Sequence, residues 1–499
     1  MRVCNAVNVW PLPQKMIEDG QSIQLSKTFT IVSTSASSVV SFAIEKYKNI
    51  IGVGLDDSGF SKLEIIIRSK NEKLALDTQY GYNITLSNDH GTLSTESVYG
   101  VLYGLETFSQ LIVNNTITHN KVEIVDFPDY VHRGIMIDTG RRFIPVHTVK
   151  MLLDSMPYNK LNVLHFHLSD FCRVSIESKH FPELTAGLTG LQGGFYTQEE
   201  IKDIIEYARL RGVRVIPEID IPGHSLGFKP MDIYGMEFCD ESKQQLYGDS
   251  EGHTYKLLTT YLEEILSLFP EPFVHLGCDE TQVHGRCNVE TAASLEKQIF
   301  DFVYNTLGKR PIAWEESLFI KHSMIPAGVV SAWTQHVNQE VIDAGYDSIE
   351  NYNGIFYLNN VWASYNNMWV DIKHLSLSSN NHGTNKAQLF GGEVSMWTDN
   401  YCYINQCGAW SGDLPIGYKL YDPSYDTQFE ESIMSIIYPR AIIAAGSFWH
   451  YDNSIDKQSS ELLELYKMAN TRLIERNIMT CPSECTCNEI TKCGKNYIE

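Results

Sequence analysis

From residue 135 onward, short apolar runs alternate with segments of helical periodicity, and this alternation limits the possible folds more than any other feature. Eight apolar runs are predicted to be strands, most of them separated by room for a helix: 135–138, 161–170, 213–219, 273–276, 311–314, 329–333, 355–358 and 392–397. Eight strand–helix units predict a closed parallel barrel of the (β/α)8 TIM type, with functional groups at the carboxyl ends of its strands.

The first 128 residues have a different pattern, which indicates a separate small domain. Segments 62–67 and 80–85 are rich in β-branched and aromatic residues, whereas 97–113 has helical periodicity. We therefore divide the 499-residue α/β chain into an N-terminal α/β domain at 1–128, a catalytic TIM barrel at 129–475 and a Cys-rich C-terminal tail at 476–499.

The charge balance excludes some classes of partner. The chain has 61 acidic and 39 basic residues and a formal net charge of −22, which repels phosphate backbones and anionic lipid. No run of about 18 apolar residues is present, which argues against a transmembrane helix. We expect no nucleic-acid partner and no membrane span.

Other features favour a lysosome-like or secreted location. Asn83 and Asn114 each begin an Asn-x-Thr triplet, the acceptor for N-glycosylation. Four cysteines near the end are predicted to form disulfides rather than a zinc site, because their spacing fits no common zinc pattern: Cys481, Cys485, Cys487 and Cys493. The N-terminal residues contain no continuous apolar segment of signal-peptide length, so a signal peptide is not evident in this chain.

Polar and aromatic residues follow the predicted strands repeatedly. They are Asp138, Arg141, His165, His167, Asp170, Glu218, Asp220, His224, Asp279, Glu280, Trp314, Glu315, Trp333, Tyr357, Asn359, Trp397 and Asp399. A single strand-end Asp usually caps a helix and a single Trp usually belongs to the core, but eight strand ends of the same character predict a cleft. Aromatic rings beside charged groups, without a phosphate-binding glycine loop, suit a sugar.

The dipeptide Asp279-Glu280 narrows the chemistry. Adjacent side chains on an extended strand point to opposite sides, so they make an awkward pair of carboxylates flanking one glycosidic bond. One of them can act as the acid while the other holds a different group. A substrate that brings its own nucleophile, such as a 2-acetamido carbonyl, needs that arrangement.

These residues lie in segments that resemble the β-N-acetylhexosaminidases of glycoside hydrolase family 20. The matching segments are HRGIMIDTGR at 132–141, HFHLSD at 165–170, IPEIDIPGH at 216–224, VHLGCDE at 274–280 and GGEVSMW at 391–397. Upstream, GVLYGLETFSQ at 100–110 resembles the end of the family's small N-terminal α/β domain. The resemblance implies an exo-acting, retaining enzyme that releases terminal N-acetyl-β-D-hexosamine from glycans or glycoconjugates by substrate assistance.

The resemblance also implies residue roles. Glu280 matches the general acid and base, and Asp279 matches the residue that orients the acetamido group and stabilises the oxazolinium intermediate. Because a general acid must stay protonated, we expect the pKa of Glu280 to lie above that of a free glutamate. The resemblance implies neither a metal nor another cofactor, and it implies a homodimer.

The remaining matches concern sugar binding and support of the acid. They are Trp314, Trp333 and Trp397 as aromatic walls, Tyr357 as donor to the acetamido oxygen, Arg141 as holder of O3 and O4, and Asp170 and His224 as a supporting relay. Two positions depart from the family pattern. Asn359 stands where relatives commonly have Asp, and Asp399 stands where they commonly have Glu, so the preference between gluco and galacto epimers stays open.

Three other interpretations lead to different functions. His165-Phe166-His167 matches a strand-end metal site of barrel hydrolases, but later strand ends bring no comparable set of histidines. A catalytically silent carbohydrate-binding protein is disfavoured because both Asp279 and Glu280 are present. A chitinase-type barrel would also use acetamido participation, but it spaces its acidic residues alternately along one strand.

Overall fold

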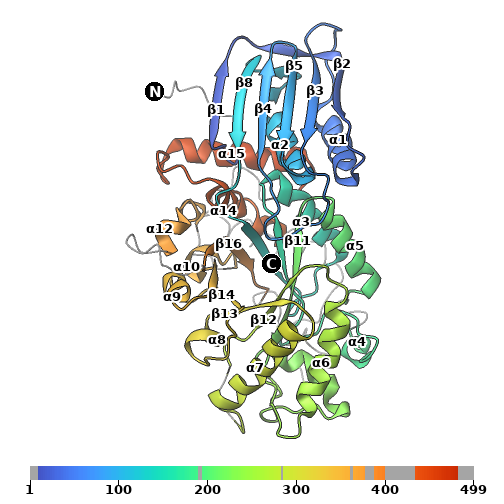
Figure 1. Ribbon diagram of the computed structural model, residues 1–499, viewed down its shortest axis with the longest axis vertical. Coiled ribbons are helices and arrows are strands. Elements are labelled where there is room, and N and C mark those ends of the chain that lie inside the picture. Colours follow the sequence, from blue (N-terminus) through green and yellow to red (C-terminus); the bar gives the residue numbers. More distant parts are fainter. Residues whose placement is uncertain are drawn as a thin grey trace, which may run out of the picture.

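A computed structural model gives the fold and describes residues 9–188, 194–281, 285–359, 364–376, 387–398 and 433–480 (Figure 1). It consists of a mixed β-sheet, at the top of Figure 1, and a closed barrel below it. This arrangement confirms the predicted α/β fold of a TIM barrel preceded by a small α/β domain.

The N-terminal sheet has eight strands in the order β1-β8-β4-β5-β3-β2-β7-β6. In chain order they are β1 Lys15–Asp19, β2 Ile23–Ser33, β3 Phe60–Ile67, β4 Tyr82–Ser87, β5 His90–Thr95, β6 Ile112–Val113, β7 Thr116–Ile117 and β8 Lys121–Asp126. Burial alternates along β4, and its inward residues share a core with helices α1 (Ser38–Ile51) and α2 (Val98–Gln110). The helices therefore cover one face of the sheet, as period-2 strands predict.

The barrel closes through parallel pairs only, in the order β10-β11-β12-β13-β14-β15-β16-β9. Its strands are β9 His132–Asp138, β10 Val163–His167, β11 Arg214–Ile221, β12 Phe273–Gly277, β13 Arg310–Trp314, β14 Val329–Ala332, β15 Asp347–Glu350 and β16 Leu389–Met396. Because every side of these strands is covered, nearly all their residues are buried.

Helices of very different length pack around the barrel. The longer ones are α3 Val146–Tyr158, α5 Gln198–Arg209, α6 His253–Leu266, α7 Val289–Asn305, α14 Arg440–Trp449 and α15 Ser460–Glu475. The shorter ones are α4 Glu183–Ala186, α8 Glu316–Phe319, α9 Asn338–Asp343, α10 Asn353–Phe356, α11 Tyr365–Met368, α12 Ile372–Ser376 and the 3-10 helix η2 Ser225–Tyr234. A capping box of Thr197 and Glu200 begins α5.

The seventh strand is not the predicted one. Segment 355–358 overlaps the short helix α10, and only Tyr357 pairs with the barrel, through an isolated bridge to Ser395. The strand in that place is β15, whose four residues include a single apolar side chain, Ile349. Its remaining positions are polar residues in buried hydrogen bonds, so it lacks the apolar run on which strand prediction depends.

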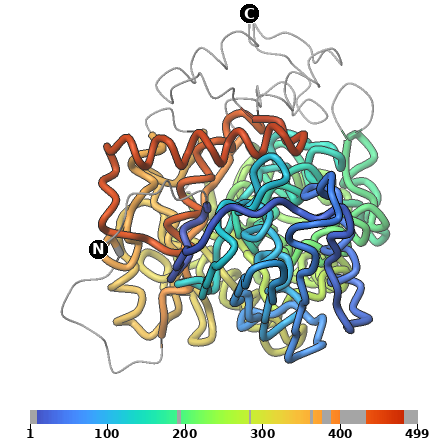
Figure 2. The backbone as a smooth tube through the Cα atoms, turned by 90° about the horizontal axis from the view of Figure 1, so that it is seen from above, coloured from blue at the N-terminus to red at the C-terminus, as the bar shows by residue number. Residues whose placement is uncertain are grey.

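A buried polar cluster joins the two parts of the molecule. Lys160 Nζ lies 2.7 Å from Asp126 Oδ2, and Asp126 Oδ1 accepts the indole N–H of Trp449. A second link joins Glu106 of α2 to Arg476, directly after α15, at 2.8 Å. The predicted boundary at residue 128 lies between β8 and β9, close to this cluster. Figure 2 shows α15, in red, running beside the N-terminal segments.

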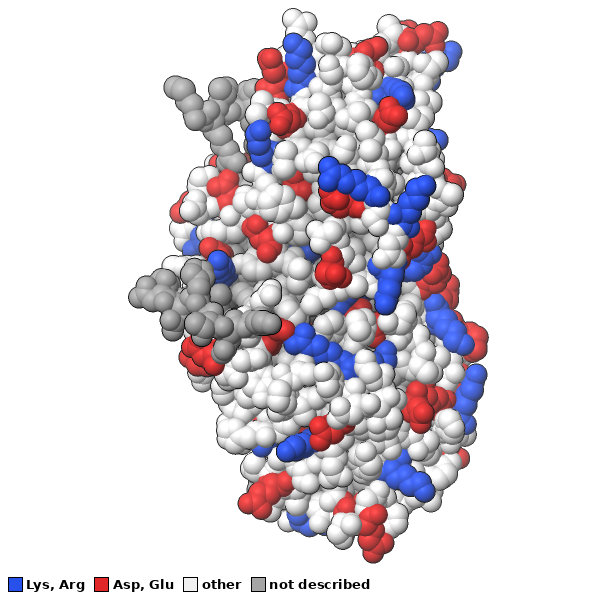
Figure 3. Space-filling model, viewed as in Figure 1, with Lys and Arg blue, Asp and Glu red and all other residues white. Residues whose placement is uncertain are grey.

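A disulfide, the surface charges and the character of the helices complete the description of the fold. Cys239 and Cys287 form a disulfide, whereas the C-terminal cysteines and their predicted pairing lie outside the described residues. Acidic and basic side chains are intermixed on the face drawn in Figure 3. Within the described residues, no helix combines the length and the apolar character needed to cross a bilayer.

Candidate active site

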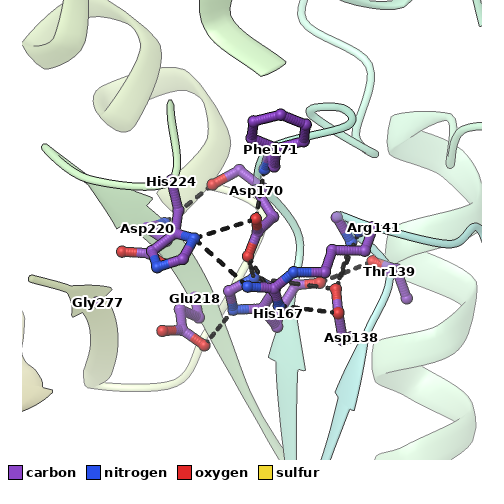
Figure 4. A network of polar contacts seen from close by, with 12 residues as sticks. Asp138, Thr139, Arg141, His167, Asp170, Phe171, Glu218, Asp220, His224 and Gly277 are labelled. Atoms are coloured by element: carbon purple, nitrogen blue, oxygen red, sulfur yellow. Dashed lines mark hydrogen bonds and ion pairs between the residues drawn. The ribbon is translucent and has the colours of Figure 1, made fainter. Parts of the chain in front are cut away.

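Arg141 is fixed between two buried carboxylates at the carboxyl end of the barrel (Figure 4). Its Nη1 lies 3.1 Å from Oδ2 of Asp138, the last residue of β9, and 3.0 Å from Oδ2 of Asp170. Asp138 also accepts the backbone N–H of Arg141. The guanidinium centre lies 5.0 Å from the ring of Trp397. A preset cation therefore borders an aromatic wall.

A chain of contacts leads from the barrel interior to the predicted acid. His167 Nε2 lies 2.8 Å from Asp170 Oδ2, and Asp170 Oδ1 lies 3.4 Å from His224 Nδ1. His224 Nε2 then lies 3.3 Å from Glu280 Oε2 and 3.6 Å from Asp279 Oδ2. The structure thus brings together four residues that the sequence predicted as catalytic or supporting.

The two adjacent carboxyl groups sit in different surroundings. The turn after β12 has positive φ at Gly277 (65°), Cys278 (69°) and Glu280 (41°), so it leaves the strand sharply. The Asp279 side chain is 11% exposed and that of Glu280 is 58% exposed. A Cβ at residue 277 would stand 1.8 Å from Asp220 Oδ1, so glycine alone fits there. Neighbouring residues therefore present one buried and one accessible carboxyl group.

The pKa values of this pair differ from the expectation. The hydrogen bond from His224 lowers the pKa of Glu280, so the predicted rise above a free glutamate is wrong for this arrangement of side chains. Burial raises the pKa of Asp279 instead. Burial of His224 favours its neutral form, but the charges of Asp170 and Asp279 outweigh this and raise its pKa well above the usual value.

Four aromatic side chains form one cluster next to these carboxyl groups. Trp314 and Trp397 are almost completely buried, with ring centroids 6.1 Å apart. Trp333 and Tyr357 are partly exposed and stack with an interplanar angle of 5°. Tyr357 lies 5.9 Å from Trp397, which joins the two pairs. The structure therefore gathers all four predicted aromatic residues into one wall.

The structure describes one of the two residues that depart from the family pattern. Asn359 follows Tyr357 by two residues and is half-buried, and its Oδ1 has no hydrogen-bond partner among the described residues. This amide oxygen is itself buried, so its missing partner is an unsatisfied acceptor close to Tyr357. Asp399 lies outside the described residues.

Sequence reasoning placed Glu218 at a strand end but gave it no role. Its Oε2 lies 2.6 Å from His167 Nδ1 and 2.8 Å from His165 Nε2, and its Oε1 accepts the Trp314 indole N–H at 3.1 Å. Burial alone would raise the pKa of Glu218, but the positive charges of the neighbouring histidines outweigh this and lower it well below the usual value. We call Glu218, His165 and His167 the charged layer of the barrel. The sequence pattern that indicates it is His-x-His on β10 beside a glutamate near the end of β11.

The same contacts bear on the metal-site interpretation. His165 directs Nδ1 to Glu393 at 2.9 Å and Nε2 to Glu218, and His167 directs its nitrogens to Glu218 and Asp170. Ligand atoms of His165, Glu218 and His275 do lie within 4.8 Å of one another. However, both nitrogens of each imidazole in the His-x-His segment already lie at ion-pair distance from a buried carboxylate. These residues therefore do not fit an open metal site.

Comparison with known proteins identifies the family. Residues 130–406 match the model of the glycosyl hydrolase family 20 catalytic domain, and residues 55–111 match a model described as beta-acetyl hexosaminidase like. The chain is 32% identical to the beta-hexosaminidase subunit alpha of Mus musculus, over 79% of this chain and 84% of that protein. It is 29% identical to beta-hexosaminidase subunit A2 of Dictyostelium discoideum, over 83% of each chain.

Solved structures show the same fold. A Flavobacterium johnsoniae chitobiase superposes with a TM-score of 0.74 at 23% identity, covering 94% of this chain and 73% of that chain. A Vibrio harveyi exo beta-N-acetylglucosaminidase, solved with N-acetylglucosamine, gives a TM-score of 0.75 at 20% identity, covering 96% and 79%. The match to the catalytic-domain model spans more than half of the chain and includes the carboxyl pair and the aromatic wall. The chain therefore belongs to glycosyl hydrolase family 20 and is a glycosidase of the β-N-acetylhexosaminidase type.

Proposed function

We propose that the enzyme removes terminal non-reducing N-acetyl-β-D-hexosamine, GlcNAc or GalNAc, by a retaining, substrate-assisted mechanism. The observation that carries the proposal is the unequal pair at the end of β12. Asp279 is buried and Glu280 is accessible, and His224 contacts both. Such a pair supplies one proton donor and one holding group, and leaves the nucleophile to the substrate.

The reaction has two steps. In the first, Glu280 donates a proton to the glycosidic oxygen while the acetamido carbonyl oxygen of the substrate attacks C1. The leaving alcohol departs, and a cyclic oxazolinium ion forms whose N–H is held by Asp279. In the second, Glu280 takes a proton from water, and the water oxygen attacks C1 from the face that the leaving group vacated. The ring opens with net retention of configuration.

In this mechanism Glu280 must gain a proton when the substrate binds. Glu280 starts with a lowered pKa because it faces His224 and solvent. A sugar in the cleft displaces water from this carboxyl group, and desolvation favours the protonated acid. Asp279, by contrast, must be ionised to stabilise the oxazolinium ion, and the raised pKa of His224 supplies the neighbouring positive charge. The pH must therefore be low enough to protonate Glu280 in the complex and high enough to ionise Asp279, whose pKa burial raises.

The other predicted residues receive binding roles in this proposal. The aromatic wall of Trp314, Trp333 and Trp397 covers the apolar faces of the sugar and its acetamido methyl group. Tyr357 donates its hydroxyl to the acetamido oxygen, and Arg141 holds O3 and O4. Asn359 hydrogen-bonds O6, Asp399 binds O4, and Asp170 with His224 orients Glu280.

We also propose glycosylation, a lysosomal or secreted location and a homodimer. The Asn83 side chain is exposed on β4, and Asn114 is exposed with φ of 50° in the turn between β6 and β7. Secretory expression should add glycan mass that Asn83→Gln and Asn114→Gln each reduce. Sedimentation should give twice the chain mass of 56.7 kDa after deglycosylation.

The first test compares 4-nitrophenyl β-N-acetylglucosaminide with 4-nitrophenyl β-glucoside, with and without a thiazoline mimic of the cyclised intermediate. We expect cleavage of the acetamido sugar alone, inhibition by the mimic and no effect of chelators. Equal cleavage of the glucoside would reveal a protein nucleophile. Activity on neither sugar, in folded protein, would favour the carbohydrate-binding interpretation, and release of internal fragments from chitin oligomers would favour a chitinase.

A further inference from the structure

The turn that carries Asp279 and Glu280 has a backbone that its neighbours must hold in place. Cys278 and Glu280 are non-glycine residues with positive φ, at 69° and 41°. L-residues adopt this region at a cost, and such conformations persist where surrounding contacts determine them. The directions of the two carboxyl groups therefore depend on what fixes the peptides on either side of them.

The buried ammonium of Lys321 makes contacts on both sides of the carboxyl pair. Its Nζ donates to the backbone carbonyl of Cys278, directly before Asp279, and to Thr281 Oγ1 at 2.9 Å, directly after Glu280. The Thr281 hydroxyl in turn donates to the Asp279 carbonyl at 3.5 Å. One cation thus brackets the two residues proposed to perform the chemistry.

Glu296 completes the coordination of this ammonium. Its Oε1 lies 3.0 Å from Lys321 Nζ, and its Oε2 accepts the Ser323 hydroxyl at 2.5 Å. The Lys321 and Glu296 side chains are at most 2% exposed. The ammonium thus donates hydrogen bonds to a carbonyl and a hydroxyl and forms an ion pair with a buried carboxylate.

The partners of the ammonium come from separate parts of the barrel. Glu296 lies on α7, which precedes β13, and Lys321 follows α8, which succeeds it. Both helices lie in the lower part of Figure 1, below the strand labels. The contact therefore connects the turn after β12 with the next two helices along the chain.

We propose that Lys321, with Glu296 as its counter-ion, is a positioning residue that holds the turn of Asp279 and Glu280 through the Cys278 carbonyl and the Thr281 hydroxyl. This inference rests on the function proposed above. Lys321 contacts the backbone and a neighbouring side chain, and acts on the reaction through them. Fixing the peptides at 278 and 281 sets the angle at which the two carboxyl groups meet the acetamido group and the glycosidic oxygen, to which rates are sensitive.

A purely structural ion pair would behave differently from a positioning residue. Its loss would lower the melting temperature and the fraction of folded protein, but the folded molecules would keep their kcat and their affinity for the thiazoline mimic. A positioning residue affects kcat per folded molecule and thiazoline affinity, while KM changes little because the aromatic wall and Arg141 still bind the sugar.

Two sets of variants separate these cases. Thr281→Val removes one contact at nearly constant volume, and Thr281→Ser retains the hydroxyl as its matched control. The double variant Lys321→Met/Glu296→Gln removes the ammonium without leaving a buried charge unpaired. We expect kcat to fall about 10-fold for Thr281→Val and about 100-fold for the double variant, with KM within about 3-fold and weaker thiazoline inhibition. Thr281→Ser should match the wild type.

We would measure kcat on 4-nitrophenyl β-N-acetylglucosaminide. Circular dichroism at the assay temperature gives the fraction of folded protein, by which kcat is normalised. A kcat within about 2-fold of wild type for Thr281→Val, or for the double variant where it folds, would overturn the positioning role. If the double variant does not fold, the comparison of Thr281→Val with Thr281→Ser decides. A wild-type protein that is inactive on this substrate would instead overturn the proposed function, which distinguishes the two failures.

Discussion

Trp314 donates its indole N–H to Glu218 over 3.1 Å, which ties the aromatic wall of the cleft to a charged layer inside the barrel. Glu218 also contacts His165 and His167, so one carboxylate serves both the wall and the chain that leads to His224. The position of the aromatic wall and the charges of the histidines beside it therefore depend on the same buried carboxylate.

Glu218→Gln should destabilise the protein and weaken catalysis together. The substitution takes one of two carboxylate partners from each of the buried imidazoles of His165 and His167, a loss of about 3 kcal/mol in the free energy of unfolding. Urea unfolding followed by tryptophan fluorescence measures this. Glu64→Gln, in the exposed pair with Lys62, is the control and should leave the midpoint unchanged. A Glu218→Gln midpoint equal to that of the control would contradict the account.

Asp279→Asn and Glu280→Gln should have different kinetic signatures. Loss of the holding carboxylate removes stabilisation of the charged intermediate, so Asp279→Asn should lower kcat about 100-fold or more for every leaving group. Glu280→Gln removes the proton donor, so its loss should be small for 4-nitrophenol and large for a sugar leaving group. Steady-state kinetics with both substrates checks this. Identical profiles for the two variants would argue against separate roles.

Stability should fall as pH rises from about 6.5 to about 9. Burial of His165 favours its neutral form, but the charges of Glu393 and Glu218 outweigh it and raise its pKa to about 9. The native state then holds a proton that the unfolded chain releases near pH 6.5, so the stabilisation is complete below that pH and is lost as pH rises through the folded value. Urea midpoints across this range measure the effect. The same slope in His165→Gln would show that another group is responsible.

Asn359 should make the cleft more tolerant of a 6-sulphated sugar than an aspartate would. A neutral amide near O6 avoids the repulsion that a carboxylate exerts on sulphate. We expect Asn359→Asp to lower kcat/KM for 4-nitrophenyl 6-sulpho-β-N-acetylglucosaminide about 10-fold more than for the unsulphated substrate, a difference of about 1.4 kcal/mol. Equally poor turnover of the sulphated sugar by both proteins would remove the idea.

The barrel, and the grouping of most of its strand-end residues, could be predicted from the sequence because buried parallel strands are continuous apolar runs with polar residues at their ends. Strand β15 could not, because Asp347, Ser348 and Glu350 are polar and take part in hydrogen bonds with partners from other segments. The pKa of Glu280 could not be predicted either, since its direction depends on the distance to His224. The contact of Lys321 with the turn of Asp279 and Glu280 carries no local signal, because it joins residues about 40 positions apart.

The proposed mechanism makes the acetamido oxygen of the substrate the nucleophile. We would measure kcat/KM for 4-nitrophenyl β-glucosaminides whose N-acetyl group carries no, one, two or three fluorine atoms. Fluorine withdraws electrons from the carbonyl oxygen at almost constant size. We expect a steep fall in rate with each added fluorine and no detectable turnover of the trifluoroacetyl substrate. A rate that is nearly independent of fluorine number would contradict this mechanism and point to a nucleophile supplied by the protein.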